Sequence, residues 1–201
     1  MVEQDGVEAP EWFAMSAPYR REMIAKELLD KKGIENFIPM RYAVVSNRLG
    51  HKSKRLVPAI HNLIFAHTTR TAIQAAKQGV NCLQYHTRLE EGRNRPIIVP
   101  DGQMEQFIAI CNQQDEEVRF LSPEEIDLEK GTRVRIIGGR FDGVEGRFVK
   151  VKGVRNRRVV VELEHITTVV LSEIEPDLIE VIEEQPERGR REKNDETVVR
   201  S

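Results

Sequence analysis

The stretch GTRVRIIGGRFDGVEGRFVKV, residues 131–151, decides the fold of the C-terminal part of the chain. It begins as an alternating strand, with arginines at 133 and 135 on one side and Val134 and Ile136 on the other. Glycines at 138, 139, 143 and 146 then interrupt the pattern, and glycine alone takes a positive φ without a Cβ penalty. The stretch therefore predicts a strand, a sharp turn and a second strand that resumes at residue 147.

The spacing of these glycines with Val134, Ile136 and Phe141 resembles the KOW motif of NusG-type transcription factors and several ribosomal proteins. Two further apolar stretches follow, VVVELE at 159–164 and TTVVLSEI at 167–174. The resemblance implies a small SH3-like KOW β-barrel of about five short strands over residues 128–182. A generic small β-barrel hairpin is the alternative interpretation.

The composition indicates a globular protein inside the cell. With 201 residues, the chain is long enough for one large or two small domains, since domains typically hold about 100–150 residues. No apolar run approaches the ~18 residues of a membrane span, and the acidic start MVEQDGVE does not resemble a signal peptide. Cys82 and Cys111 lie far apart and outside any C-x-x-C pair, so we expect no disulfide framework and a cytoplasmic location.

The distribution of charge predicts two domains. Residues 1–114 and 131–171 carry a net positive charge, whereas 115–130 and 172–201 carry a net negative charge. The acidic stretch contains Ser122-Pro123, which is typical of a linker, and we expect two domains that are free to move. The predicted organisation is a flexible N-terminus (1–10), a first domain (11–114), an acidic linker (115–127), a KOW domain (128–182) and a disordered tail (183–201).

Hydrophobic periodicity predicts that the first domain is an α+β fold, an antiparallel sheet flanked by helices. Pro39 should bend its second strand or confine that strand to an edge. Turn residues predict a turn at 90–96. Strands are expected at residues 11–17, 35–45, 59–69 and 80–86, and helices at 19–32, 69–79 and 101–112.

A basic segment interrupts this pattern. SNRLGHKSKRLVP, residues 46–58, has no apolar periodicity and predicts an exposed loop or hairpin tip. Cationic side chains at this density suit a phosphate backbone, and a solvated loop without a ligand is the alternative. The candidate nucleic-acid-binding residues are Arg48, Lys52, Lys54 and Arg55.

The sequence offers no pattern for catalysis. We find no converging nucleophile, base and stabilising group. The five histidines lack H-x-x-x-H or H-E-x-x-H spacing, and no G-x-x-x-x-G-K-[ST] phosphate loop occurs. We therefore expect a binding protein rather than an enzyme, with neither a metal nor a cofactor.

The first domain also resembles the N-terminal (NGN) domain of the NusG family. The resemblance rests on W-F-x-M-x-A-x-x-x-R-E from residue 12, FIPM at 37–40, the basic segment, and IHNLIFA at 60–66. The family usually has a proline, glycine, tyrosine, valine, phenylalanine pattern where this chain has IHNLIF, so it resembles a divergent member. The specialised UpxY-like paralogues, antiterminators at capsular polysaccharide operons, are the most similar subset.

This resemblance implies a cytoplasmic, monomeric transcription elongation or antitermination factor. Its first domain would dock on the clamp helices of the largest RNA polymerase subunit, bridge the DNA cleft and suppress pausing or termination. The basic segment would face upstream or non-template DNA. The polymerase-binding candidates are Phe13, Phe37, Leu63 and Phe65, for each of which a plain core role is the alternative.

The resemblance further implies that the KOW domain recruits another partner, either the ribosome or a termination factor. The second hypothesis is a KOW-type RNA-binding or ribosome-associated accessory protein that acts through this domain alone. The candidate partner surface consists of Arg140, Phe141, Arg147, Arg155, Arg157 and Arg158.

Overall fold

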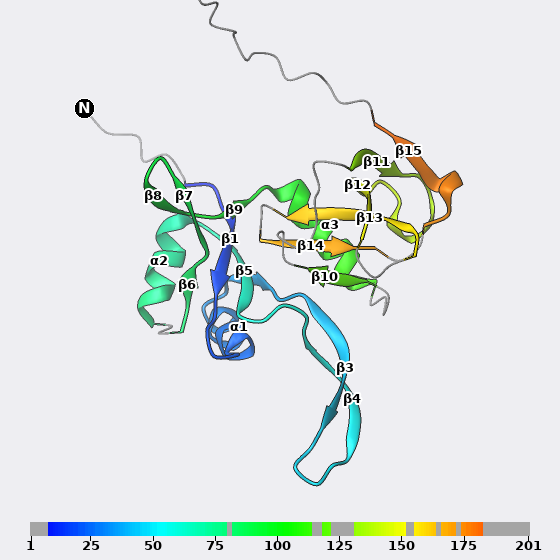
Figure 1. Cartoon of the computed structure of the whole chain (residues 1–201). Helices are drawn as coiled ribbons and strands as arrows, with labels where there is room; N and C mark the ends of the chain where they lie inside the picture. The colour runs from blue at the N-terminus through cyan, green and yellow to red at the C-terminus, as the bar shows by residue number, and fades with distance from the viewer. Residues whose placement is uncertain are drawn as a thin grey trace, which may run out of the picture.

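The computed structural model describes residues 8–79, 82–113, 118–121, 131–151, 155–163, 166–171 and 174–182. They form an N-terminal α+β domain and a C-terminal antiparallel sheet, with helix α3 (Asp101–Asn112) packed between them (Figure 1). Most of the predicted linker, the predicted tail and the first seven residues of the predicted N-terminus lie outside the described residues.

The N-terminal sheet is antiparallel, and β1 lies inside it. Its strands follow the order β2-β5-β1-β6, and β9 also pairs with β1. The longest pairing joins β1 to β5, from Glu11 opposite Thr68 to Ser16 opposite Leu63. These strands are β1 (Glu11–Ser16), β2 (Glu35–Phe37), β5 (Leu63–Thr68), β6 (Gln84–Tyr85) and β9 (Ile98–Val99).

Three helices flank this sheet, as the sequence predicts. Helices α1 (Glu22–Lys31) and α2 (Arg70–Gly79) pack on one face, and α3 packs on the other. Helix α1 begins at Glu22 rather than at residue 19, because Tyr19 and Arg20 have φ values of 63° and 57°, which a right-handed helix excludes. The buried carboxylate of Glu22 then accepts a 2.6 Å hydrogen bond from the backbone N–H of Asn62.

Two hairpins extend from this domain. The strand predicted at 35–45 is divided at Pro39, and its second part becomes one arm of the larger hairpin. Residues 52–58, predicted as part of a loop or hairpin tip, form the other arm. Of the turn predicted at 90–96, only residues 91–92 are a turn, because residues 93–96 pair with residues 87–90 as the second strand of the smaller hairpin. The hairpins are β3 (Met40–Ser46) with β4 (Lys52–Pro58), and β7 (Thr87–Glu90) with β8 (Arg93–Pro96).

The C-terminal sheet contains the predicted strand, turn and strand of residues 131–151. Gly138 and Gly139 take φ values of 81° and 72° at the turn. At Gly146 an added Cβ would lie 2.6 Å from the carbonyl oxygen of Val160, so a residue without a Cβ is required. The strands are β11 (Thr132–Ile136), β12 (Glu145–Lys150), β13 (Arg157–Leu163), β14 (Thr167–Val170), β15 (Ile179–Val181) and β10 (Arg119–Leu121).

The order β10-β14-β13-β12-β11-β15 shows that this sheet begins inside the segment predicted as a linker. Strand β10 pairs antiparallel with β14, with Phe120 opposite Val169. The described sheet therefore has six strands rather than about five, because a short strand between acidic stretches carries too few apolar residues to show periodicity.

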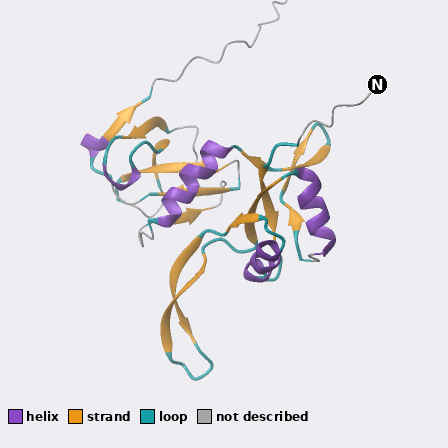
Figure 2. Ribbon diagram, turned by 180° about the vertical axis from the view of Figure 1, so that it is seen from behind, coloured by secondary structure: helices purple, strands orange, loops and turns teal. Residues whose placement is uncertain are grey.

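One apolar core joins the two parts of the molecule. The ring of Phe107 on α3 lies 5.7 Å from that of Phe65, 6.1 Å from that of Phe37 and 6.3 Å from that of Phe120. Phe65 and Phe37 belong to the N-terminal sheet, and Phe120 belongs to β10. Instead of two freely moving bodies, the structure shows two sheets that pack around α3 (Figure 2).

Candidate functional site

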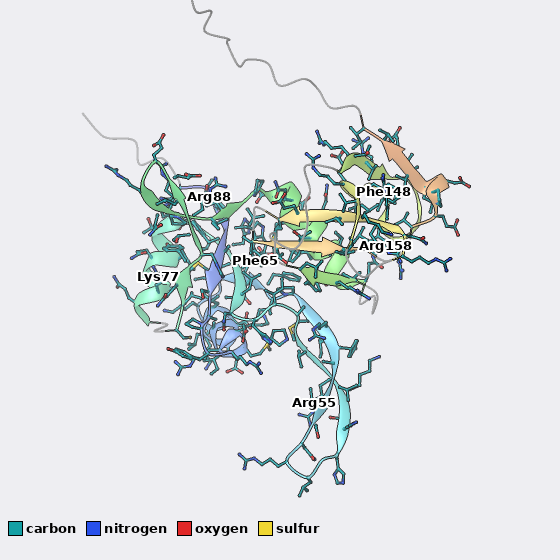
Figure 3. All side chains as sticks on the ribbon, in the orientation of Figure 1. Arg55, Phe65, Lys77, Arg88, Phe148 and Arg158 are labelled. Atoms are coloured by element: carbon teal, nitrogen blue, oxygen red, sulfur yellow. The ribbon has the colours of Figure 1, made fainter. Side chains whose placement is uncertain are left out.

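The β3–β4 hairpin projects away from both sheets and carries the predicted nucleic-acid-binding residues (Figure 1). Arg48 lies in its tip, and Lys52, Lys54 and Arg55 lie on β4, all with exposed side chains. Figure 3 shows Arg55 on this projecting ribbon, well separated from the centre of the molecule. The structure thus brings the four residues onto one exposed element.

Strand register distributes these cations over both faces of the ribbon. Opposed residues of an antiparallel pair lie on the same face. Val44 pairs with Lys54 and Ser46 with Lys52, so the two lysines share one face. Arg55, opposite Ala43, lies on the other face.

The tip of the hairpin is closed by the side chain of Asn47. Its Oδ1 accepts hydrogen bonds from the backbone N–H groups of Leu49, at 3.0 Å, and His51, at 2.9 Å. The N–H of Asn47 donates to the carbonyl of His51 at 3.0 Å, and Gly50 takes a φ of 81°. These bonds give the tip, including Arg48, a defined conformation.

Two further hairpin residues extend the candidate site beyond the predicted segment. Arg41 lies opposite Val57 on the face that carries Arg55, and Lys54 holds its ammonium 5.0 Å from the ring centre of Tyr42. Sequence reasoning missed Arg41 and Tyr42 because they precede the basic run and belong to an apolar strand.

The predicted polymerase-binding residues do not form one surface. Phe13 lies on the face of the sheet covered by α1 and α2 and is fully buried. Leu63 and Phe65 lie on the opposite face, beneath α3, with 1% and 0% of their surface exposed. Phe37 is half-buried at the border of that core, and Figure 3 places Phe65 near the centre of the molecule.

Sequence reasoning also missed the part that Phe107 and Phe120 play in covering this face. Phe107 belongs to the apolar pattern of α3, but its contacts with three rings follow from tertiary packing. A groove of about 540 Å³ opens beside this contact, between the base of the β3–β4 hairpin and β10. Cys111 lines the groove, and burial raises the pKa of its thiol to about 12, which keeps it protonated at neutral pH.

The predicted partner residues of the C-terminal sheet have different environments. Phe141 is buried, with 2% of its surface exposed, and the guanidinium of Arg140 lies 5.1 Å from its ring centre. Arg147 donates a 3.0 Å hydrogen bond to the carbonyl of Gly131. The remaining three lie near the β12–β13 turn, where Arg155 and Arg157 are exposed and Arg158 is half-buried.

A carboxylate orders two further arginines of this sheet, which share a face with Arg147. Glu145 accepts hydrogen bonds from Arg135 Nη2, at 2.6 Å, and Nε, at 3.1 Å. These bonds raise the pKa of Arg135 above its ordinary value, because they stabilise its charged form. Arg133 approaches the same carboxylate at 3.8 Å.

Within the described ranges, no group of three or more His, Cys, Asp or Glu side chains is placed to hold a metal ion. No helix in that part of the chain is long and apolar enough to cross a bilayer. The molecule is defined instead by an α+β domain with three helices, a projecting basic hairpin, and a second antiparallel sheet packed on α3.

Comparison with known proteins assigns the first domain. Residues 10–108 match the family described as "Transcription termination factor nusG", a span that runs from just before β1 into α3. This domain is therefore a NusG-family domain.

No curated protein sequence matches the chain significantly. Among solved structures, one described as "Domain interaction in Thermotoga maritima NusG" is similar to this chain. The two are 18% identical, the match covers 87% of this chain and 98% of that one, and the TM-score is 0.44.

Proposed function

We propose that this protein is a transcription elongation and antitermination factor that binds RNA polymerase through its N-terminal domain. The match of residues 10–108 to the NusG family carries the proposal. It acts as a binding protein rather than as an enzyme, and it suppresses pausing or termination. Its targets are polysaccharide biosynthesis operons, a choice supported by the resemblance of its divergent N-terminal motifs to the UpxY-like paralogues.

The docking surface in this proposal is the face of the N-terminal sheet on which Phe37, Leu63 and Phe65 lie, and its partner is the clamp helices of the polymerase. Apolar side chains of this kind anchor protein interfaces once they are desolvated. Because Leu63 and Phe65 are buried beneath α3, docking requires that α3 and the C-terminal sheet move apart from this face. Phe13 supports the same sheet from its opposite side.

The C-terminal sheet is, in this proposal, a KOW domain that recruits the ribosome or a termination factor. Supporting this assignment are the glycine pattern of residues 131–151 and the antiparallel pairing of β11 with β12. Arg140, Arg155 and Arg157 provide exposed positive charge for such a partner. Partner recruitment and polymerase docking would then use different surfaces.

Co-purification from lysate tests the proposal. Tagged full-length protein is expected to retain RNA polymerase, and Phe120→Glu is expected to retain several times more. The reason is that a carboxylate at position 120, beside the ring of Phe107, disfavours the packing in which α3 and the C-terminal sheet cover Phe65. Val181→Glu serves as the matched control, because Val181 is 63% exposed on the edge strand β15 and far in sequence from α3.

Two results would contradict the proposal. Failure of both the wild-type and the Phe120→Glu protein to retain polymerase would exclude polymerase binding. Recovery of ribosomal subunits or RNA in place of polymerase would instead favour the KOW-type accessory protein, for which the exposed arginines of the C-terminal sheet are the supporting observation.

A further inference from the structure

We propose that the β3–β4 hairpin enters the major groove of duplex DNA tip first, with its two faces toward the two phosphate backbones. This inference goes beyond the proposed function and starts from the candidate nucleic-acid-binding residues on the hairpin described above. It adds the form of the nucleic acid, the groove and the roles of individual side chains.

Charge identifies the ribbon as a surface for a polyanion. Residues 40–58 contain five arginines and lysines and no aspartate or glutamate, in a chain whose overall charge is −2. The basic side chains of β4 and the tip are exposed. Because the rest of the protein is nearly neutral, its positive electrostatic potential is strongest at this hairpin. A phosphate backbone is therefore attracted to the hairpin rather than to the whole protein surface.

The dimensions of the ribbon select the groove. Stacked β-sheets pack about 10 Å apart, which sets the space that one sheet takes up with its side chains. The major groove of B-DNA is about 12 Å wide and 8.5 Å deep, whereas the minor groove is about 6 Å wide. The ribbon therefore fits the major groove and is too thick for the minor groove.

The depth of the groove selects the residues that enter. At about 3.3 Å per residue, a groove 8.5 Å deep accepts between two and three residues along the ribbon, which are the tip and the last residue pair. This pair is Ser46 with Lys52, and the pairs Val45 with Ser53 and Val44 with Lys54 then stand at the rim of the groove, where the phosphates lie. Lys52 and Lys54 then face one backbone, and Arg55 reaches the other from the opposite face.

The tip supplies the group that reaches base edges. Arg48 lies in the turn whose conformation the Asn47 bonds define. A guanidinium at the floor of the major groove pairs with guanine N7 and O6. We therefore assign Arg48 to base contact and the cations of β4 to phosphate contact.

The ribbon is less suited to single-stranded nucleic acid. Proteins bind single strands by stacking bases on aromatic rings. Tyr42 is the sole aromatic residue between positions 40 and 58, and the ammonium of Lys54 lies 5.0 Å from its ring centre, which occupies one face of the ring. One partly covered ring does not form a stacking platform.

Methylation interference on full-length protein tests the inference. Dimethyl sulfate modifies guanine N7 in the major groove and adenine N3 in the minor groove, so one reagent reports on both. A labelled duplex of about 20 base pairs and mixed sequence is treated lightly, mixed with protein, and separated into bound and free fractions. We expect the bound fraction to be depleted in N7-methylguanine and not in N3-methyladenine, and the duplex to bind roughly tenfold more tightly than its single strand.

Two variants assign the contacts. Arg48→Ala is expected to remove the guanine interference while duplex binding falls only a few-fold. Lys31→Ala on α1, an exposed lysine outside the hairpin, is expected to change neither result. Both positions are exposed, so neither substitution removes core packing.

The outcomes separate the major-groove inference from nucleic-acid binding by the hairpin in general. Interference at N3-methyladenine, persistence of the guanine interference in Arg48→Ala, or tighter binding of the single strand would overturn the major-groove inference and leave nucleic-acid binding intact. Absence of binding to either DNA would overturn both.

Discussion

Replacing Phe107 with alanine is expected to lower the free energy of unfolding by about 3–5 kcal/mol, the range for a fully buried phenylalanine. Its side chain has no exposed surface and contacts rings from β2, β5 and β10. Truncation leaves a cavity where both sheets meet α3. Urea denaturation followed by circular dichroism measures the loss. Leu49→Ala, at a position 81% exposed in the hairpin tip, should stay within about 0.5 kcal/mol of the wild type.

A double-mutant cycle on Phe107 and Phe120 isolates the part of this loss that belongs to the contact between the two sheets. Aromatic pairs contribute about 0.5–1.5 kcal/mol beyond the burial of their area, and residues in contact are not additive. We expect a coupling energy in that range. Fully additive effects of Phe107→Ala and Phe120→Ala would show that β10 does not pack on α3 in solution.

Reversing three charges on the hairpin is expected to abolish most of the salt-sensitive binding to duplex DNA. The variant carries Arg48→Glu, Lys52→Glu and Arg55→Glu, and all three side chains are exposed on one projecting element. Each phosphate contact contributes about 0.9 to the slope of log K against log salt concentration, so loss of the two phosphate contacts of Lys52 and Arg55 flattens the slope by about 1.8. Fluorescence anisotropy across a salt series measures both the affinity and the slope.

A charge-matched variant controls for the change in net charge. Lys31→Glu, Lys32→Glu and Arg93→Glu alter the charge equally at exposed positions outside the hairpin. Their slope should stay near that of the wild type. An equal loss in both variants would mean that overall charge, and not the hairpin, attracts DNA.

Elements that bury an apolar face could be predicted from the sequence. Periodicity predicts helix α3 at residues 101–112, where the structure has it, because its buried side chains recur at helical spacing. Strand β1 and helix α2 also lie close to their predicted bounds for this reason. In each of these elements, tertiary packing keeps the secondary structure that the local apolar pattern predicts.

Elements without a buried face could not be predicted in the same way. Strand β4 has five consecutive exposed residues, so no alternation of apolar and polar residues marks it as a strand. It exists because β3 pairs with it along its whole length. Strand β10 is short and lies between acidic residues, and its pairing with β14 joins positions that are distant in the chain.

The candidate site, too, could be predicted from the sequence only in part. The basic run 46–58 is visible in the sequence, but the assignment of Lys54 and Arg55 to opposite faces needs the register. Four apolar residues could be nominated for polymerase binding from a family resemblance. Sequence alone could not show that Phe13 and Phe65 lie on opposite sides of one sheet, or that α3 covers Phe65.

Single-round transcription with purified RNA polymerase on a pause-containing template tests the central claim most directly. The measured quantity is the half-life of the paused complex at increasing concentrations of the protein. The account predicts that the wild-type protein shortens this half-life. Phe120→Glu, in which the packing of the C-terminal sheet on α3 is weakened, should shorten the half-life at a lower protein concentration. An unchanged half-life with both proteins would contradict the account.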